Sequence, residues 1–180
     1  MRHRHQKNGF SLIETLVAIT VLVFGIVGPL TLAQIGLRSF SQIRDRIVAE
    51  YLAQEGLEIV RNIRDTALIQ DPASGLPQFT PCQSAVGCYV DATSNSPALT
   101  NCTGTGCPPL RYDRATGEYN YSTGVNTIFT RAIFVSPGNL NTSEANGEEA
   151  LVTSRVTWPS RLVGTETVEF TGYLTDWFRF

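Results

Sequence analysis

The chain has 180 residues, of which 42% are hydrophobic and 17% are charged, and its formal net charge is −2. The length allows one compact domain, and the hydrophobic fraction is too high for a disordered protein and too low for a protein with many membrane spans. The charged fraction is below the roughly 25% of typical soluble domains, because one segment near the amino terminus is almost free of charge. One apolar segment followed by a polar remainder excludes a polytopic transporter and an ordinary cytosolic enzyme.

Residues 1–9 form a basic segment with three fixed positive charges and no acidic residue. Residues 15–33, which follow closely, contain no ionisable side chain, and the run approaches the roughly 20 residues that a helix needs to cross a bilayer. Because a basic flank keeps the amino terminus in the cytoplasm, the rest of the chain is expected outside. The pattern fits a cleaved secretory signal, an ordinary membrane anchor or a more specific signal.

Glu14, at the start of the apolar run, separates these alternatives. A secretory signal has an apolar core of about 7–15 residues, and the run here is longer, although residues 31–33 weakly resemble a signal cleavage site. A carboxylate that moves toward the bilayer centre costs about 2.5 kcal/mol or more. An ordinary anchor therefore explains the length of the run but not Glu14, which indicates a function.

Residues 9–14 read Gly-Phe-Ser-Leu-Ile-Glu, and this string closely resembles the processing motif of type IV prepilins and of the related pseudopilins of type II secretion. Four features are in register with that motif: the Gly before the cut, the Phe after it, the Ser-Leu pair and the Glu. The basic leader and the apolar helix are the context that the family requires. One departure is Asn8, which separates Lys7 from Gly9, where many members place the basic residue beside the Gly.

The resemblance implies a processing pathway and a set of partners. A membrane-embedded prepilin peptidase is expected to cleave between Gly9 and Phe10 and then to methylate the new amino group of Phe10. Glu14 is expected to neutralise that amino group during filament assembly. The implied partners are this peptidase, other pilin subunits and an inner-membrane assembly platform. The implied location is the cytoplasmic membrane, with a single span and the carboxyl-terminal head outside, and then an extracellular pilus.

Removal of the leader limits the chemistry that the mature chain can support. Both histidines and the sole lysine lie in residues 1–9, and the loss of three positive charges takes the formal net charge from −2 to −5. A Ser-His-Asp triad, a histidine zinc site and a lysine Schiff base are then impossible, and we expect no cofactor, metal or enzymatic activity. A net charge of −5 also argues against nucleic acid as a partner, because it offers no broad basic patch for phosphates.

The helical pattern continues beyond the apolar run through residue 64. Large apolar residues recur at three- and four-residue steps, which predicts an amphipathic helix whose apolar stripe packs on a globular head. We expect residues 10–37 to form the transmembrane and filament-core half and residues 38–66 the amphipathic half. Pro29 removes a backbone hydrogen bond and is expected to kink or locally loosen the first half. The stripe consists of Phe40, Ile43, Ile47, Tyr51, Leu52, Ile59, Val60 and Ile63.

Residues 67–109 form an irregular region, rich in turn residues, that contains all four cysteines. Because this region is expected in an oxidising space, the even number of cysteines favours disulfides. Four cysteines allow three pairings, and we favour the two local bridges because each closes a short loop. A zinc ribbon is the alternative, but cysteines that ligate zinc are usually spaced more closely. The favoured bridges join Cys82 to Cys88 and Cys102 to Cys107.

In residues 110–180 the period of the apolar residues becomes two, which predicts an antiparallel sheet with one face on the helix. The expected fold is therefore α+β, with a long amino-terminal helix packed on an antiparallel sheet, as the pilin resemblance also implies. The expected strands cover residues 110–113, 118–122, 127–135, 152–158 and 168–174, and the first two are joined as a hairpin.

Two features of this region have a plain and a functional interpretation. The loop of residues 136–149 is acidic toward its end, and some pseudopilins hold calcium in such a loop. We favour a solvated loop, because no ordered ligand spacing is present. The aromatic residues near the carboxyl terminus are expected to pack at the sheet edge and not to form a binding platform. These residues are Tyr173, Trp177, Phe178 and Phe180.

The sequence features that distinguish a minor pilin from a pseudopilin are weaker than the processing motif. Residues 16–19, together with Gly25 and Gly28, are similar to the minor pilins of the pilus-modification group, and we favour a minor type IV pilin. The alternative is a minor pseudopilin of a type II secretion system, which differs in partners and not in chemistry. A single-span surface enzyme or binding module is the alternative from another class, and the missing histidines and the lack of a nucleophile motif count against it.

Overall fold

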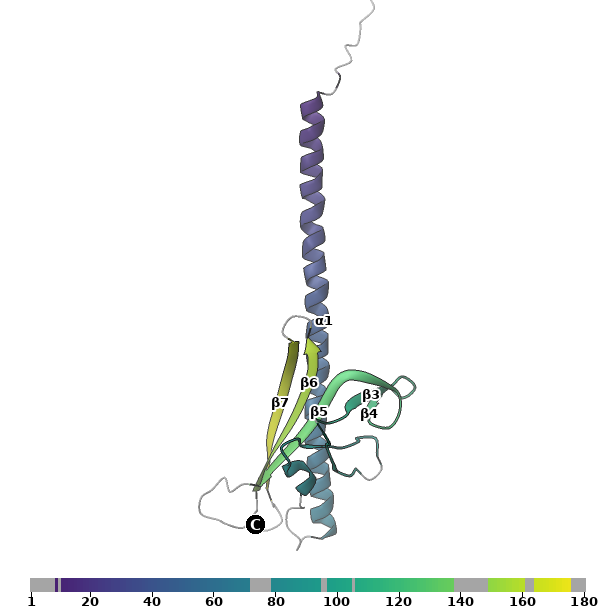
Figure 1. The fold of residues 1–180 in the computed structure, drawn as a ribbon, viewed down its shortest axis with the longest axis vertical. Helices are drawn as coiled ribbons and strands as arrows, with labels where there is room; N and C mark the ends of the chain where they lie inside the picture. Colours follow the sequence, from purple (N-terminus) through teal and green to yellow (C-terminus); the bar gives the residue numbers. More distant parts are fainter. Residues whose placement is uncertain are drawn as a thin grey trace, which may run out of the picture. The chain divides into compact units, whose positions relative to one another are not determined.

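The computed structural model describes residues 9, 11–71, 79–94, 97–104, 106–137, 149–160 and 164–175. These residues form one long helix, a short 3-10 helix and a seven-stranded antiparallel sheet (Figure 1). The expected α+β, pilin-like architecture is confirmed. The elements are α1 (Leu12–Gln70), η1 (Thr80–Gln83), β1 (Cys88–Tyr89), β2 (Thr100–Asn101), β3 (Pro109–Asp113), β4 (Glu118–Asn120), β5 (Val125–Pro137), β6 (Glu149–Ser160) and β7 (Gly164–Thr175).

The chain divides into two compact units, Met1–Arg44 and Asp45–Phe180. The first unit contains the amino-terminal part of α1. The second unit contains the rest of α1 together with η1 and all seven strands, and it is called the head below.

In the first unit, α1 is apolar and exposed. Every residue from 11 to 37 is exposed, and by length and composition α1 can cross a membrane. The hydroxyl groups of Thr15, Thr20 and Thr31 donate hydrogen bonds to helix carbonyls three or four residues earlier. These hydroxyl groups are therefore satisfied within the helix, as an apolar environment requires.

The helix continues through Pro29 without a break, so the expected loosening does not interrupt α1. Pro29 has no N–H to donate to the carbonyl group of Gly25. Beside it, the Thr31 hydroxyl donates to the carbonyl oxygens of Val27 and Gly28, at 3.1 and 2.7 Å. Threonine side chains that bind freed or strained backbone groups are one reason why membrane helices tolerate proline.

β5 is the central strand of the head. It pairs with β1 and β3 on one side and with β6 on the other, and β7 pairs with β6 over the whole length of both strands (Figure 1). Alternate residues of β6 are buried, as the period of two predicts. The strands expected at residues 127–135, 152–158 and 168–174 are confirmed, and each is longer in the structure.

The expected hairpin is formed by β3 and β4. Gly117 has a φ of +78°, which favours glycine, and its N–H donates to the carbonyl oxygen of Asp113 at 2.8 Å. β4 ends at Asn120, two residues earlier than expected. The reason is the buried Asn120 side chain, whose oxygen accepts the N–H groups of Ser122 and Thr123 and turns the chain there.

The face of α1 that packs on the sheet is only partly the expected stripe. Leu52 and Val60 are buried as expected. The small residues Ala49, Ala53 and Gly56 are buried too, because they let the helix backbone approach the strands closely. The expectation was wrong for the other half of the stripe, because its large side chains are exposed. These exposed residues are Phe40, Ile43, Ile47 and Tyr51.

The irregular region lies on β5 and contains two disulfides. Cys82 is bonded to Cys88 and Cys102 to Cys107, which are the two local bridges. Gly87 has a φ of +78°, and a Cβ at this position would be 2.8 Å from the carbonyl oxygen of Ile133. Only glycine therefore allows this segment to lie so close to β5.

Several sequence expectations concern residues outside the described ones, namely most of the acidic loop and the aromatic residues Trp177, Phe178 and Phe180. Tyr173 is described, on the edge strand β7, and it is 57% exposed. The expected packing was wrong for Tyr173, because alternate residues of β7 face away from α1 and Tyr173 is one of these.

Candidate processing and assembly site

The sequence motif lies at the start of α1. Gly9 and Ser11 precede the helix, Phe10 lies outside the described residues, and α1 begins at Leu12. The carbonyl oxygen of Ser11 accepts the N–H groups of Glu14 and Thr15, at 3.0 and 3.2 Å. The helix therefore begins within a few residues of the expected cleavage point.

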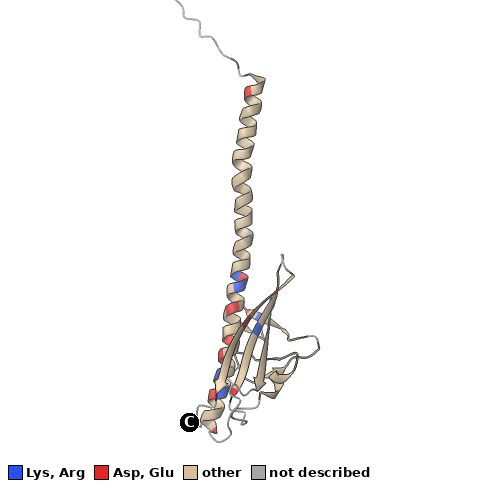
Figure 2. Ribbon diagram, turned by 90° about the vertical axis from the view of Figure 1, so that its left-hand side faces the viewer, with Lys and Arg blue, Asp and Glu red and all other residues tan. Residues whose placement is uncertain are grey.

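Glu14 lies in the first turn of α1, where an acidic side chain interacts favourably with the helix dipole. The residue is exposed, and among the described residues it takes part in no ion pair. In Figure 2 the ribbon of α1 is red at one acidic position near this end, and a long uncharged stretch follows. Within the described chain, the charge of Glu14 is therefore isolated on an apolar helix.

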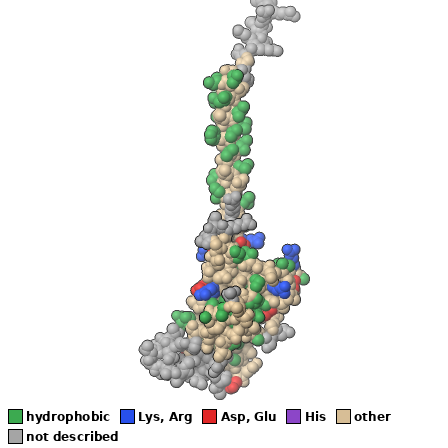
Figure 3. All heavy atoms as spheres, viewed as in Figure 1, with side chains coloured by type: hydrophobic (Ala, Val, Ile, Leu, Met, Phe, Trp, Pro, Cys, Tyr) green, Lys and Arg blue, Asp and Glu red, His purple; other side chains and the backbone are tan. Residues whose placement is uncertain are grey.

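The surroundings of Glu14 on the helix are hydrophobic. Figure 3 shows hydrophobic side chains along this part of α1, whereas basic and acidic side chains are seen on the head. Leu12, Ile13 and Val17 are 83%, 72% and 53% exposed. So large an exposed apolar surface is typical of contact with lipid or with other protein chains.

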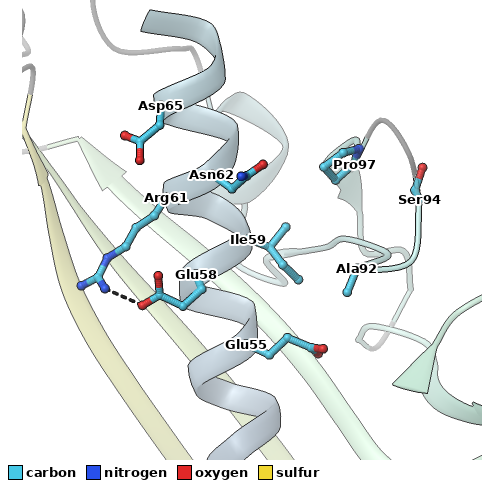
Figure 4. A pocket seen from close by; sticks show the side chains of 9 residues that line it. All are labelled: Glu55, Glu58, Ile59, Arg61, Asn62, Asp65, Ala92, Ser94 and Pro97. Atoms are coloured by element: carbon cyan, nitrogen blue, oxygen red, sulfur yellow. Dashed lines mark hydrogen bonds and ion pairs between the residues drawn. The ribbon is translucent and has the colours of Figure 1, made fainter. Parts of the chain in front are cut away.

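The head contains a groove of about 630 Å³ between α1 and the segment that follows β1 (Figure 4). Glu55, Ile59 and Asn62 point toward the segment of Ala92, Ser94 and Pro97, whereas Glu58, Arg61 and Asp65 point to the other side of α1. Each carboxylate already has a cationic partner, because Glu55 pairs with Arg131, Glu58 with Arg61 and Asp65 with Arg64. The acidic side chains do not converge, and no group of metal-ligating residues occurs in the described ranges.

Arg131, which the sequence did not single out, is the main charged residue of the head interior. It is fully buried on β5, and its guanidinium lies 5.9 Å from the centre of the Tyr121 ring. Burial raises the pKa of the Tyr121 hydroxyl, and the charge of Arg131 opposes this shift. The signal that could have identified Arg131 is its position, since it alternates with the apolar residues Phe129 and Ile133 on the core face of one strand.

Asp91 lies close to the same arginine, after β1. Burial acts to raise the pKa of its carboxyl group. Hydrogen bonds from Thr93 and from the Tyr121 N–H, together with the charge of Arg131, outweigh burial and hold the pKa below its ordinary value. As a carboxylate, Asp91 therefore joins the segment after β1 to the segment after β4 through the Tyr121 N–H.

A comparison with protein families identifies the amino-terminal motif. Residues 4–28 match the family described as the prokaryotic N-terminal methylation motif, which is the type IV pilin signature. No curated protein and no solved structure matches the chain. The matched residues include Gly9, Phe10 and Glu14, and they support a processed subunit of the pilin or pseudopilin type. The motif indicates a structural role, and it indicates processing by prepilin peptidase and assembly with other pilins.

Proposed function

We propose that the chain is a minor pilin, a structural subunit of a type IV pilus-type filament. Prepilin peptidase removes residues 1–9 and methylates the amino group of Phe10. The mature subunit then stays in the membrane through α1 until it enters the filament. The observation that carries this proposal is the order of the motif and the helix, since the cleavage motif, Glu14 and an unbroken apolar helix follow one another without a gap.

In this proposal Glu14 pairs with the amino group of Phe10 on a neighbouring subunit. Opposite charges attract strongly in a low-dielectric helix bundle, and each is costly when it is buried alone. A wrong stagger between subunits buries Glu14 without a partner, so the charge pair selects one arrangement of the filament. The isolated position of Glu14 on an exposed apolar helix supports this role.

The proposed topology is a single span with the head outside the cytoplasm. The basic residues of the leader precede the apolar segment in the sequence, and basic flanks stay in the cytoplasm. The head, with its two disulfides, follows the apolar segment in the chain, and disulfides persist in oxidising compartments. The inner-membrane assembly platform is the proposed partner that transfers the subunit from the bilayer to the filament.

The pseudopilins of type II secretion undergo the same processing. A minor pilin and a minor pseudopilin therefore differ only in the partners with which they assemble. The similarity of residues 16–19, Gly25 and Gly28 to minor pilins supports the pilus. The test is mass spectrometry of sheared filaments from cells that lack either the pilus platform or the secretion platform. We expect the chain to disappear from filaments only when the pilus platform is absent. Loss only when the secretion platform is absent would instead assign the chain to secretion.

A further inference from the structure

Arg131 joins three segments of the head from a fully buried position on β5. One terminal nitrogen donates to the Leu52 carbonyl oxygen at 3.2 Å and to the Glu55 carboxylate, both on α1. The other terminal nitrogen donates to the Val90 carbonyl oxygen, after β1, at 3.0 Å. A buried guanidinium that loses such partners is strongly destabilising, so these contacts define where α1 can lie.

Gly56 provides a second, steric constraint at the same place. A Cβ at Gly56 would lie 2.4 Å from the Ser154 hydroxyl oxygen on β6 and 3.0 Å from Cδ of Arg131. Ser154 is fully buried, so its side chain cannot turn outward to solvent. The helix backbone therefore comes so close to β5 and β6 that a side chain at residue 56 would displace the side chain of Ser154 or of Arg131.

A shift of α1 by four residues along the sheet would break both constraints together. Four residues before or after Glu55 are Tyr51 and Ile59, and neither can pair with Arg131. Four residues before or after Gly56 are Leu52 and Val60, whose side chains would collide with Ser154. A shift by four residues thus buries an unpaired charge and creates a clash. A shift by three residues can bring Glu58 to Arg131, but it then places the side chain of Ile59 against Ser154.

The apolar contacts of the same helix face select one position of α1 along the sheet much less strongly than the charge and the steric contact do. α1 presents alanines and branched aliphatic residues to the sheet on successive turns, so a one-turn shift exchanges one apolar contact for another. Burial of apolar area is non-directional, and it cannot by itself select one position. The residues concerned are Ala49, Leu52, Ala53, Leu57 and Val60.

We propose that Arg131, Glu55, Gly56 and Ser154 form a register lock that holds the head at one position along α1. The lock is a property of the single chain. Its consequence rests on the proposed function, because subunits joined through α1 would then present every head at the same height along the filament. Arg131 is buried, whereas the Glu55 side chain is 40% exposed. A buried polar or charged group that specifies register at little gain in stability is a known use of such groups in helical assemblies.

The test measures the distance between spin labels on the two sides of the helix–sheet contact, in the full-length chain in detergent. The labels are attached to cysteines introduced at Gln54 of α1 and Thr171 of β7, which are both exposed. All cysteines within the described ranges are in disulfides and do not react. We expect one narrow distance distribution in the otherwise unchanged chain. In a variant that removes both constraints, Arg131→Met combined with Ser154→Ala, we expect a second population, displaced by about one helical turn, or roughly 5 Å.

Arg155→Met is the matched control. Arg155 lies on β6, where it bonds to Glu169 at the partly exposed face of the sheet, so its loss should leave one narrow distribution. A single unchanged distribution in the combined Arg131→Met and Ser154→Ala variant overturns the proposal, whatever happens to the midpoint of unfolding. Because the distances come from the isolated chain, a failure of the proposed filament function would not alter this result.

Gly56→Ala keeps the proposal testable if the combined Arg131→Met and Ser154→Ala variant does not fold. This variant is expected to broaden or displace the distance distribution, and adding Ser154→Ala is expected to restore it by removing the oxygen 2.4 Å away. If Gly56→Ala leaves the distribution unchanged, or if Ser154→Ala does not restore it, Gly56 does not act through Ser154 and the lock is refuted.

Discussion

Gly172 of β7 lies directly against Leu57 of α1, since a Cβ at Gly172 would be 3.1 Å from both methyl carbons of Leu57. Both residues are buried. Interiors are close-packed, so this contact leaves no space between the helix and the edge strand of the head. The position of β7 therefore depends on the lack of a side chain at residue 172.

The first prediction follows from this contact. Gly172→Val adds methyl groups where Leu57 and Arg61 already lie at 3.1 and 3.2 Å from the Cβ position, and overpacking of this kind costs about 1–3 kcal/mol. We expect a lower midpoint in urea unfolding of the full chain in detergent. Thr171→Val, one residue earlier and exposed, is the control and should change the midpoint little. An equal effect of both variants would show that strand propensity, and not packing, is measured.

The second prediction concerns acid stability. The pKa of Asp91 is held below the ordinary value of 3.8, so its carboxylate stabilises the fold above about pH 3.8, and this stabilisation is lost as the pH falls through the folded-state pKa. Asp91→Asn is therefore expected to be less stable than the unchanged chain at pH 7, and the difference should shrink toward pH 2. Chemical unfolding across this range measures it, and a difference that stays constant with pH would contradict the assignment.

The third prediction concerns the disulfides. Peptide mapping without reduction should show Cys82 linked to Cys88 and Cys102 linked to Cys107. Each bridge closes a short loop, and replacing Cys82 and Cys88 together by Ser is expected to lower the free energy of unfolding by about 2 kcal/mol. Free thiols or stoichiometric zinc in the exported protein would contradict this prediction, whereas a crossed pairing would change only the connectivity.

The fourth prediction concerns processing. Intact mass spectrometry of the exported protein should show a chain that begins at Phe10 and carries one added methyl group. Replacing Gly9 by a bulky residue should leave the leader attached, because the motif requires Gly before the cut. A mature chain that begins near Gln34 would instead identify the amino terminus as a secretory signal.

Much of the sheet could be predicted from the sequence because one of its faces is buried. In β6 the alternation of apolar and polar residues around Val152 and Val156 appears directly as alternate burial. The Glu14 motif was equally readable, since its residues are adjacent in the chain and need no tertiary structure to be recognised. Both patterns involve residues that are close together in the chain, so they can be recognised without the folded structure.

The face of α1 and the interior charge could not be predicted for a shared reason. The sequence argument gave weight to large apolar residues such as Tyr51, but the helix packs through Ala53 and Gly56, where close approach is possible. Arg131 is buried because Glu55 and two carbonyl oxygens meet it from other segments. Such partners, far apart in the sequence, come together only in the folded head.

The groove beside α1 could not be predicted from the sequence either. Its walls combine helix residues such as Asn62 with Pro97, from the segment after β1, and no sequence pattern connects these two positions. Its carboxylates also have partners that are not evident from the sequence, because one of them is the buried Arg131. A functional site assembled across segments has to be found in the structure.

The central claim is that Glu14 acts in assembly and not in the folding of the head. Glu14 belongs to the first unit, and no described residue of the head pairs with it. Glu14→Ala removes a charge from the bilayer, so the membrane-bound subunit should be at least as stable as before. In the filament the amino group of Phe10 would lose its partner, at a cost on the order of a few kcal/mol per subunit contact.

The most direct measurement is blotting of sheared filaments from cells that make Glu14→Ala, with the unchanged chain and Glu14→Asp as controls. We predict that the Ala variant loses its leader, keeps a folded head and remains in the membrane fraction, while its amount in filaments falls strongly. Glu14→Asp, which keeps the charge, should enter filaments better than Glu14→Ala. If the Ala variant enters filaments as well as the unchanged chain does, Glu14 does not guide assembly through charge pairing.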